Sequence, residues 1–247
     1  MAATTGRATA NEVERANGSG LTPVVFIHGL WLLPNSWDRW AALFEQAGYT
    51  ALTPGWPDDP DTVAEARAHP EVFARKKVGP VADHFSELIG RLKKKPAVVG
   101  HSFGGLLTQI AAGRGLSAAS VAIDPAPFRG VLPLPLPALK AASPVIGNPA
   151  NRNRSIPLTY PQFRFAFANA VSEDEAKELY DTFAVPASGR RVGAEPRAPR
   201  RRPGRTSDHR RRGSAKTVVA LTEQQNELAS ARSAPAPSLV ARQPGGW

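Results

Sequence analysis

The stretch that decides the fold is Val98-Val99-Gly100-His101-Ser102-Phe103-Gly104-Gly105. It carries the pattern Gly-x-Ser-x-Gly after an apolar run and before the apolar residues 106–112. A serine at a sharp strand-to-helix turn is held in a strained conformation that exposes its hydroxyl above the sheet. Backbone N–H groups at the start of the following helix favour a developing negative charge. The pattern predicts that Ser102 is a nucleophile, with an inert serine in a glycine-rich turn as the alternative, and that His101 packs beneath the turn.

Strand-like and helix-like patterns alternate on both sides of this turn. Residues 23–27 form an all-apolar run that suits a strand buried on both faces of a parallel sheet, and residues 49–54 and 120–123 are further strand candidates. Apolar residues recur at helical spacing over residues 37–47 and 80–92. This alternation predicts an α/β fold, with a mostly parallel sheet covered by helices on both faces.

A second feature is the run His28-Gly29-Leu30-Trp31, which directly follows the first strand. An acyl-transfer site needs two N–H donors directed at the oxyanion, one from the residue after the nucleophile and one from the loop after an earlier strand. We expect Phe103 and Leu30 to supply these oxyanion-hole donors. We expect His28 to hold the loop rather than to act as a base, whereas Trp31 either lines the substrate pocket or packs in the interior.

These motifs resemble those of the α/β-hydrolase superfamily, and the chain is similar to its bacterial serine hydrolases of unassigned substrate. The resemblance rests on residues 25–29, on Gly48-Tyr49, on residues 100–105 and on Ile123-Asp124-Pro125. It covers roughly residues 20–186. It implies a hydrolase of the carboxylesterase or lipase type that cleaves an ester or a related acyl substrate through a Ser acyl-enzyme, with no cofactor and no metal. It also implies a helical cap inserted after the strand that ends at Asp124.

Changes in composition and residue pattern divide the chain into four parts. Residues 1–20 are polar, which predicts a disordered leader. Residues 21–127 hold the α/β-hydrolase core with the nucleophile turn. Residues 128–186 are the expected helical cap, with no obvious strand and with Ser172 opening a helix. Residues 187–247 form a basic, low-complexity tail.

The positive charge of the chain belongs to this tail. Residues 187–247 carry 13 basic and 4 acidic residues, whereas residues 1–186 carry 18 and 17. The tail has too few large apolar residues for a core of its own and is expected to contribute at most one helix, over residues 217–231. The C-terminal strands of the fold are therefore expected to be missing. An out-of-frame reading of GC-rich DNA from about residue 190 explains the change in composition, with a natural basic tail as the competing explanation.

A serine nucleophile is weak without a base. The expected chain order is Ser, then acid, then His, and the only histidine after Ser102 is His209. Asp124 is the best-placed acid, because it follows a strand at the edge where such sheets keep their chemistry. We assign Asp124 and His209 as acid and base, although both also suit purely structural positions. His69 and His84 are expected on the surface or in packing.

Other functions remain open at this point. The chain is either a working esterase, a catalytically impaired relative without a functional His and acid pair, or a cofactor-free perhydrolase. Arginine runs at residues 200–202 and 210–212 would bind nucleic acid only non-specifically, and no aromatic residue interleaves with them for base stacking. The aromatic residues of the expected cap, Phe163, Phe165 and Phe167, indicate an apolar acyl or aryl group.

The composition excludes some kinds of site and bears on the cellular compartment of the protein. The chain has no cysteine, which excludes a disulfide scaffold, a Cys nucleophile and cysteine-based metal sites. Prolines interrupt residues 130–147, so no apolar run reaches the ~18 residues of a membrane span. The N-terminal residues lack a hydrophobic signal core. We expect a cytoplasmic protein with a small-molecule acyl substrate and no membrane association, and the sequence indicates no oligomeric state.

Overall fold

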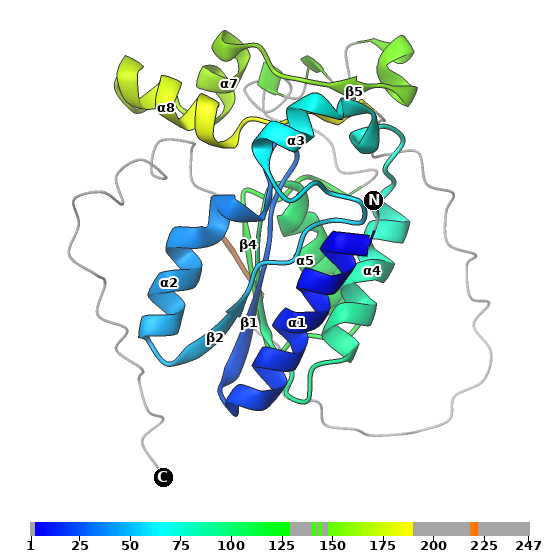
Figure 1. Cartoon of the computed structure of the whole chain (residues 1–247), viewed down its shortest axis with the longest axis vertical. Helices are drawn as coiled ribbons and strands as arrows, with labels where there is room; N and C mark the ends of the chain where they lie inside the picture. Colours follow the sequence, from blue (N-terminus) through cyan, green and yellow to red (C-terminus); the bar gives the residue numbers. More distant parts are fainter. Residues whose placement is uncertain (1–2, 129–139, 142, 145–147, 190–217, 222–247) are drawn as a thin grey trace.

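Parallel strands form the centre of the molecule. The computed structural model of the chain describes residues 3–128, 140–141, 143–144, 148–189 and 218–221 (Figure 1). The sheet has the strand order β2-β1-β3-β4-β7, and its four pairings are all parallel. Its strands are β1 (Thr22–Ile27), β2 (Tyr49–Leu52), β3 (Ala97–His101), β4 (Ala119–Ile123) and β7 (Val218–Leu221). The expected α/β fold is confirmed.

Helices cover both faces of this sheet. They are α1 (Ala3–Ser19), α4 (Val78–Gly90) and α5 (Phe103–Gly113) on one face and α2 (Asp38–Gln46) on the other. Val25 and Ile27 of β1 pack toward the first face, and Val24 and Phe26 pack toward the second. All four side chains are fully buried, which explains the uninterrupted apolar run in the sequence. Among the described residues, no helix is long and apolar enough to cross a membrane.

The N-terminal residues form an ordered part of the fold. Residues 3–19 form helix α1, so the expectation of a disordered leader over residues 1–20 is wrong for most of its length. Val13 and Ala16 are buried in the core beneath the first face of the sheet. Sequence analysis missed this helix because it is polar along most of its length and has few apolar side chains at helical spacing.

Helix α1 also covers the exposed edge of the sheet at β2. The Arg15 guanidinium donates a hydrogen bond to the carbonyl of Ala51 at 2.5 Å, and the Glu12 carboxylate accepts one from the N–H of Thr53 at 2.9 Å. An edge strand presents unpaired backbone groups that invite association with other chains. Arg15 thus binds a carbonyl of the edge strand, and Glu12 binds the N–H of the residue that follows it.

A second layer lies over the carboxyl ends of the strands (Figure 1). We call residues 148–189 the overlying segment. It contains a 3₁₀ turn (Pro149–Asn153), β5 (Ser155–Ile156), α7 (Tyr160–Phe167), α8 (Glu173–Phe183) and β6 (Ala187–Ser188). The Ser172 hydroxyl caps α8 as expected by accepting from the N–H of Glu175.

Two features of the overlying segment differ from expectation. Strands β5 and β6 pair antiparallel, although no strand was expected within residues 128–186, and β6 extends the segment past residue 186. A two-residue strand is too short to leave a period-2 pattern in the sequence. Outside the overlying segment, the connection between β2 and α4 contains a short helix, α3 (Val63–Ala68), and a 3₁₀ turn (Pro70–Phe73).

One strand of the sheet comes from the C-terminal part of the chain. Strand β7 pairs with β4, with Val218 opposite Ser120 and Leu221 opposite Ile123. This corrects two expectations in part: one C-terminal strand is present, and residues 218–221 of the helix expected over 217–231 form a strand instead. The apolar run of β7 suits a parallel sheet, but polar and basic neighbours conceal it in the sequence. Most of the expected tail lies outside the described residues.

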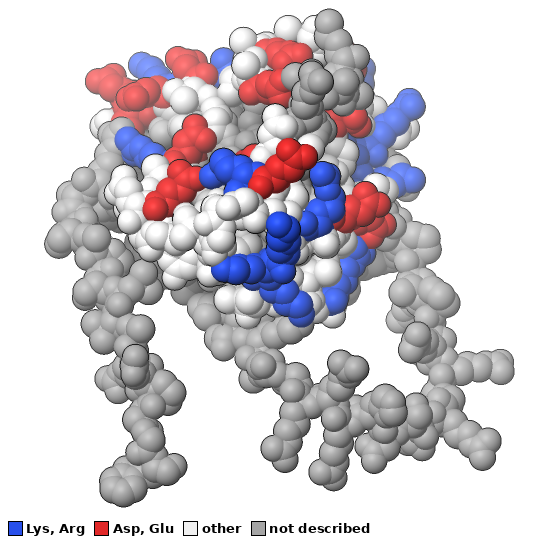
Figure 2. Space-filling view, turned by 60° about the horizontal axis from the view of Figure 1, so that its bottom comes forward, with Lys and Arg blue, Asp and Glu red and all other residues white. Residues whose placement is uncertain are grey.

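Charged side chains gather at the amino-terminal end of the strands, which Figure 2 brings forward. Lys93, Lys94 and Lys95 are exposed in the turn after α4. The ammonium of Lys95 donates to the carbonyl of Gly115 at 2.9 Å, and that of Lys94 donates to the carbonyl of Gly20. Acidic residues lie beside the basic ones on this face (Figure 2).

The docking of α1 can be tested with two neighbouring residues. Val13 is 2% exposed, whereas Glu14 is exposed. We expect Val13→Ala to lower the free energy of unfolding by about 2 kcal/mol, because it leaves a cavity beneath the sheet. The control Glu14→Ala should change it by less than about 0.5 kcal/mol. Equal effects of the two variants in urea unfolding would contradict a docked helix.

Candidate active site

Ser102 lies at a sharp turn between β3 and α5. Its backbone has φ 54° and ψ −115°, a conformation that non-glycine residues rarely adopt. The N–H of Ser102 donates to the carbonyl of Ile123 at 2.9 Å, and its own carbonyl accepts from the N–H groups of Leu106 and Ala126. Strained backbone of this kind clusters at functional sites and persists only where neighbouring structure fixes it. The geometry is that of a nucleophile elbow, a name we use for residues 100–104.

Glycines make the close packing of the elbow possible. A Cβ at Gly104 would overlap the carbonyl oxygen of Ile27 in β1, and a Cβ at Gly100 would overlap the carbonyl of Gly104. A Cβ at Gly29 would lie 3.1 Å from the Cβ of Ser102. The first turn of α5 therefore sits directly on β1 and β3, and the loop after β1 lies against Ser102.

The two expected oxyanion-hole residues flank the elbow. Phe103 is the first residue of α5, and Leu30 lies in the loop after β1, one residue from Gly29. Within the described residues, neither N–H group donates to a backbone carbonyl. Both side chains pack against the core under the first face of the sheet. The structure thus brings the two N–H groups to the same end of the sheet as Ser102.

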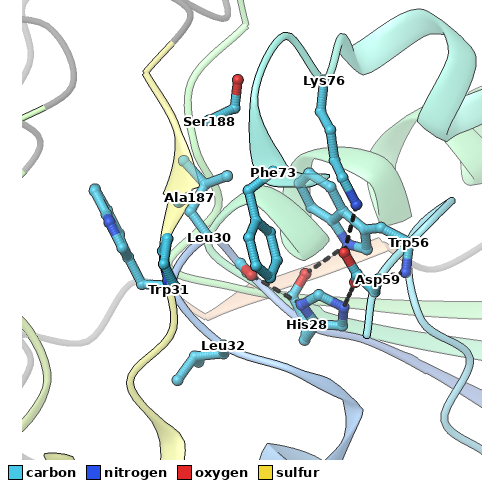
Figure 3. Close-up of a pocket in the computed structure, with 12 residues that line it drawn as sticks. His28, Leu30, Trp31, Leu32, Trp56, Asp59, Phe73, Lys76, Ala187 and Ser188 are labelled. Atoms are coloured by element: carbon cyan, nitrogen blue, oxygen red, sulfur yellow. Dashed lines mark hydrogen bonds and ion pairs between the residues drawn. The ribbon is translucent and has the colours of Figure 1, made fainter. Parts of the chain in front are cut away.

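Trp31 connects the loop after β1 to the overlying segment. Its indole Nε1 donates to the carbonyl of Ile156 at 3.0 Å, and its own carbonyl accepts from the N–H of Val185 at 3.1 Å. Its φ of 64° is positive, and its side chain is buried in the apolar cluster of the overlying segment. Trp31 also lines a small pocket between the two layers (Figure 3). Trp31 therefore packs in the interior, as one of the two expected roles requires, and its place in a substrate pocket stays a prediction.

Asp124 follows β4 and lies in the loop that is hydrogen-bonded to the elbow. Its φ is 40°, so Asp124, like Ser102 and Trp31, has a backbone conformation unusual for its residue type. The side chain is half-buried, and this burial raises the pKa of its carboxyl. Its carboxylate has no hydrogen bond or ion pair with any described residue. Asp124 thus lies at the carboxyl end of β4, and its role as the acid stays a prediction.

The other histidines considered from the sequence are His209, His69 and His84. His209, the expected base, lies outside the described residues. His69 is exposed and contacts the carboxylate of Glu71 at 3.3 Å. His84 lies on α4, where burial is the largest of the effects that lower its pKa. The expectation of surface or packing roles for His69 and His84 is confirmed.

His101 faces the overlying segment rather than packing beneath the elbow. The centre of its ring is 6.5 Å from that of Phe167 in α7, and its Nδ1 lies near Gly29. Burial lowers the pKa of His101 to about 4, so its imidazole is neutral at pH 7. The sequence-based expectation is wrong because the contact depends on a residue more than sixty positions further along the chain.

Phe167 brings an aromatic ring close to the elbow. Its ring centre is 6.5 Å from that of Trp31 and 6.5 Å from that of His101, the two residues that flank Leu30 and Ser102 in the chain. Phe163 is buried behind it with ring centres 5.1 Å apart. Phe165 instead lies below the ammonium of Lys140. Of the three aromatic residues considered for the substrate, Phe167 is the one nearest the elbow.

Sequence analysis missed a buried charged network beside this site. Asp59 lies in the loop after β2 and contacts both His28 and Lys76 (Figure 3). These three residues line the same small pocket as Trp31 and Ser188. The acidic cluster around Asp59 was visible in the sequence, but nothing there distinguished one buried carboxylate from its exposed neighbours. In the described residues, no three His, Asp or Glu side chains gather closely enough to hold a metal ion.

Comparisons with known proteins agree with this geometry. A family model described as "Alpha/beta hydrolase family" matches residues 24–246. An extracellular alpha/beta-hydrolase from a Paenibacillus species is 24% identical with a TM-score of 0.52, and the alignment covers 67% of this chain and 66% of that one. Polyneuridine aldehyde esterase is 18% identical with a TM-score of 0.52, covering 71% and 73%. The chain thus spans just under two thirds of the Paenibacillus protein. No curated protein matches it.

The packing of the elbow predicts a large difference between two glycines of the same helix. Gly104→Ala should lower the free energy of unfolding by about 3 kcal/mol, because the new Cβ has to displace the backbone of β1. Gly113→Ala, with open space around its Cβ, should raise it by up to about 1 kcal/mol. Thermal and urea unfolding of the two variants measures the difference. A Gly104→Ala protein as stable as the wild type would contradict the close approach.

Proposed function

Because this chain belongs to the alpha/beta hydrolase family, we propose that it hydrolyses a carboxylic ester or a related acyl compound through an acyl-enzyme on Ser102. The observation that carries the proposal is the strained conformation of Ser102 at the start of α5. A serine held in this way presents its hydroxyl at the carboxyl end of the sheet. The esterase among the similar structures supports an ester as the substrate class.

In this mechanism the Oγ of Ser102 attacks the carbonyl carbon while a base takes its proton. The negative charge that develops on the carbonyl oxygen is stabilised by the N–H groups of Leu30 and Phe103. The base then protonates the leaving alcohol, and the acyl group remains on Ser102. A water molecule, deprotonated by the same base, attacks the acyl-enzyme, releases the acid and restores the serine.

We assign the base to His209 and the acid to Asp124. The described histidines fit a base poorly. Both ring nitrogens of His28 contact oxygen atoms in the interior, and His101 is directed toward Phe167. Asp124 lies next to the elbow with its carboxylate available, and a neighbouring imidazolium would offset the burial that raises its pKa. His209 follows Asp124 in the chain order that this family uses.

The overlying segment would act as the cap of this site and select an apolar substrate. The ring of Phe167 lies 6.5 Å from that of His101 in the elbow and 6.5 Å from that of Trp31. Aromatic rings at this place suit an apolar acyl or aryl group. The small-molecule substrate would then enter between the sheet and α7.

The proposed mechanism predicts that two single substitutions abolish turnover. Ser102→Ala and His209→Ala should each lower kcat for p-nitrophenyl acetate by up to ~10⁶-fold, because nucleophile and base act as one unit. Ser86→Ala on α4 is a matched control that should keep full activity. Turnover that survives Ser102→Ala would contradict the function, and turnover that survives only His209→Ala would contradict the assignment of the base.

The proposed substrate preference predicts an effect of Phe167 on acyl-chain length. Phe167→Ala should raise the ratio of kcat/KM for p-nitrophenyl octanoate to that for the acetate by about 10-fold, because it removes a ring near the elbow. Phe165→Ala, in the same helix but directed at Lys140, should leave the ratio unchanged. The same ratio in both variants would show that Phe167 does not bound the acyl site.

A further inference from the structure

A buried carboxylate lies behind the loop that follows β1. The Asp59 side chain is 3% exposed. One of its oxygens, Oδ2, accepts from the N–H of Trp56 at 2.9 Å and contacts His28 Nε2 at 3.1 Å. The other, Oδ1, is 2.5 Å from the ammonium of Lys76. Asp59 therefore ties the loop after β2 to the loop after β1 (Figure 3).

Both nitrogens of His28 face oxygen atoms that can only accept hydrogen bonds. Nε2 faces the Asp59 carboxylate, and Nδ1 lies 2.9 Å from the carbonyl of Gly29. These two contacts hold the imidazole ring between the Asp59 carboxylate and the carbonyl of Gly29, so the ring links the buried carboxylate to the loop after β1.

The Asp59 carboxylate can hold His28 because it stays ionised. Burial by itself raises the pKa of Asp59, but the hydrogen bond and charge of His28, with the charge of Lys76, outweigh it and leave the pKa below its usual value. A buried ion pair is seldom the most stable solution, since apolar residues of similar volume often replace it at no cost. The arrangement of these charges therefore calls for a reason other than stability.

The hydrogen bond of His28 controls the orientation of one particular peptide group. The carbonyl of Gly29 and the N–H of Leu30 belong to the same planar peptide, and in the trans form they point in opposite directions. Holding the carbonyl toward His28 thus directs the N–H of Leu30 to the other side. Gly29 lies against Ser102, so this peptide is the part of the loop nearest the elbow.

We propose that Asp59 is a positioning residue, which acts through His28 to fix the Gly29–Leu30 peptide with the Leu30 N–H directed at the oxyanion. The inference rests on the function proposed above and adds the device that orients one of its two donors. Trp56 completes it, because its indole stacks on the His28 ring and donates to the His28 carbonyl. An oxyanion donor acts on the transition state more than on bound substrate.

The test compares two neighbouring aspartates of the same loop. Asp59→Asn removes the charge that holds His28, whereas Asp58→Asn changes an exposed side chain. With p-nitrophenyl acetate, we expect Asp59→Asn to lower kcat by about 10- to 100-fold with KM little changed, because a small displacement of a donor has an effect of this size. Asp58→Asn should match the wild type.

Two readouts separate positioning from general damage. The inhibition constant of a trifluoromethyl ketone, whose serine adduct carries an oxyanion, should rise by the same factor as kcat/KM falls. Asp59→Asn combined with His28→Gln should lower kcat no further than either change alone, because both act through one contact. A rise in KM with kcat unchanged, or additive effects in the double variant, would overturn the proposal.

Hydrogen exchange distinguishes failure of this inference from failure of the proposed function. In Asp59→Asn, the backbone amides of residues 28–32 should exchange faster than in Asp58→Asn, whether or not the chain turns over an ester. Equal exchange overturns the positioning role. Turnover that survives Ser102→Ala overturns the function instead. If Asp59→Asn does not fold, His28→Gln, which leaves Asp59 paired with Lys76, is judged by the same criteria.

Discussion

The contact on which the rest of the structure depends is the close approach of the first turn of α5 to β1. At Gly104 no side-chain atom fits between the helix and the carbonyl of Ile27. This approach forces Ser102 into its strained conformation and places the loop after β1 beside it. The energy of that strain is offset by the burial of β1 and β3 between helices on both faces of the sheet. Ser102 and the two N–H groups therefore lie at one end of the sheet because the whole sheet and its covering helices, not the site residues alone, fix the backbone there.

A second constraint on the loop after β1 is electrostatic and is centred on the buried carboxylate of Asp59. The loop after β1 has no regular hydrogen bonding of its own, so side chains must hold its peptides in place. His28 and Trp31 do so from two sides, one bonded to Asp59 in the core and the other to the carbonyl of Ile156 in the overlying segment. The sheet and the layer above it thus meet at four consecutive residues, 28–31.

The edges of the sheet show how the chain completes the fold from distant segments. At β2, two side chains of α1 bind backbone groups that a further strand would otherwise pair. At β4, the short strand β7 supplies a parallel neighbour from almost one hundred residues further along the chain. Helix α1 is mostly polar, and the four apolar residues of β7 have polar neighbours in the chain, so each addition depends on the sheet already being present.

The sequence by itself determined the parallel sheet, the elbow and the candidate residues Ser102, Leu30 and Phe103, because these features depend on local patterns. Each of these patterns can be recognised within a few positions of the chain: an apolar run, a helical spacing of apolar side chains, and glycines two residues before and after a serine. Only the tertiary structure decided that Val13 is buried, that His101 faces Phe167 and that Asp59 rather than Asp58 holds His28. These outcomes depend on contacts between residues far apart in the sequence, where local composition carries no information about the partner. The same reason explains why α1 and β7 were missed, since a helix or strand made mostly of weak local signals is stabilised by the surface against which it packs.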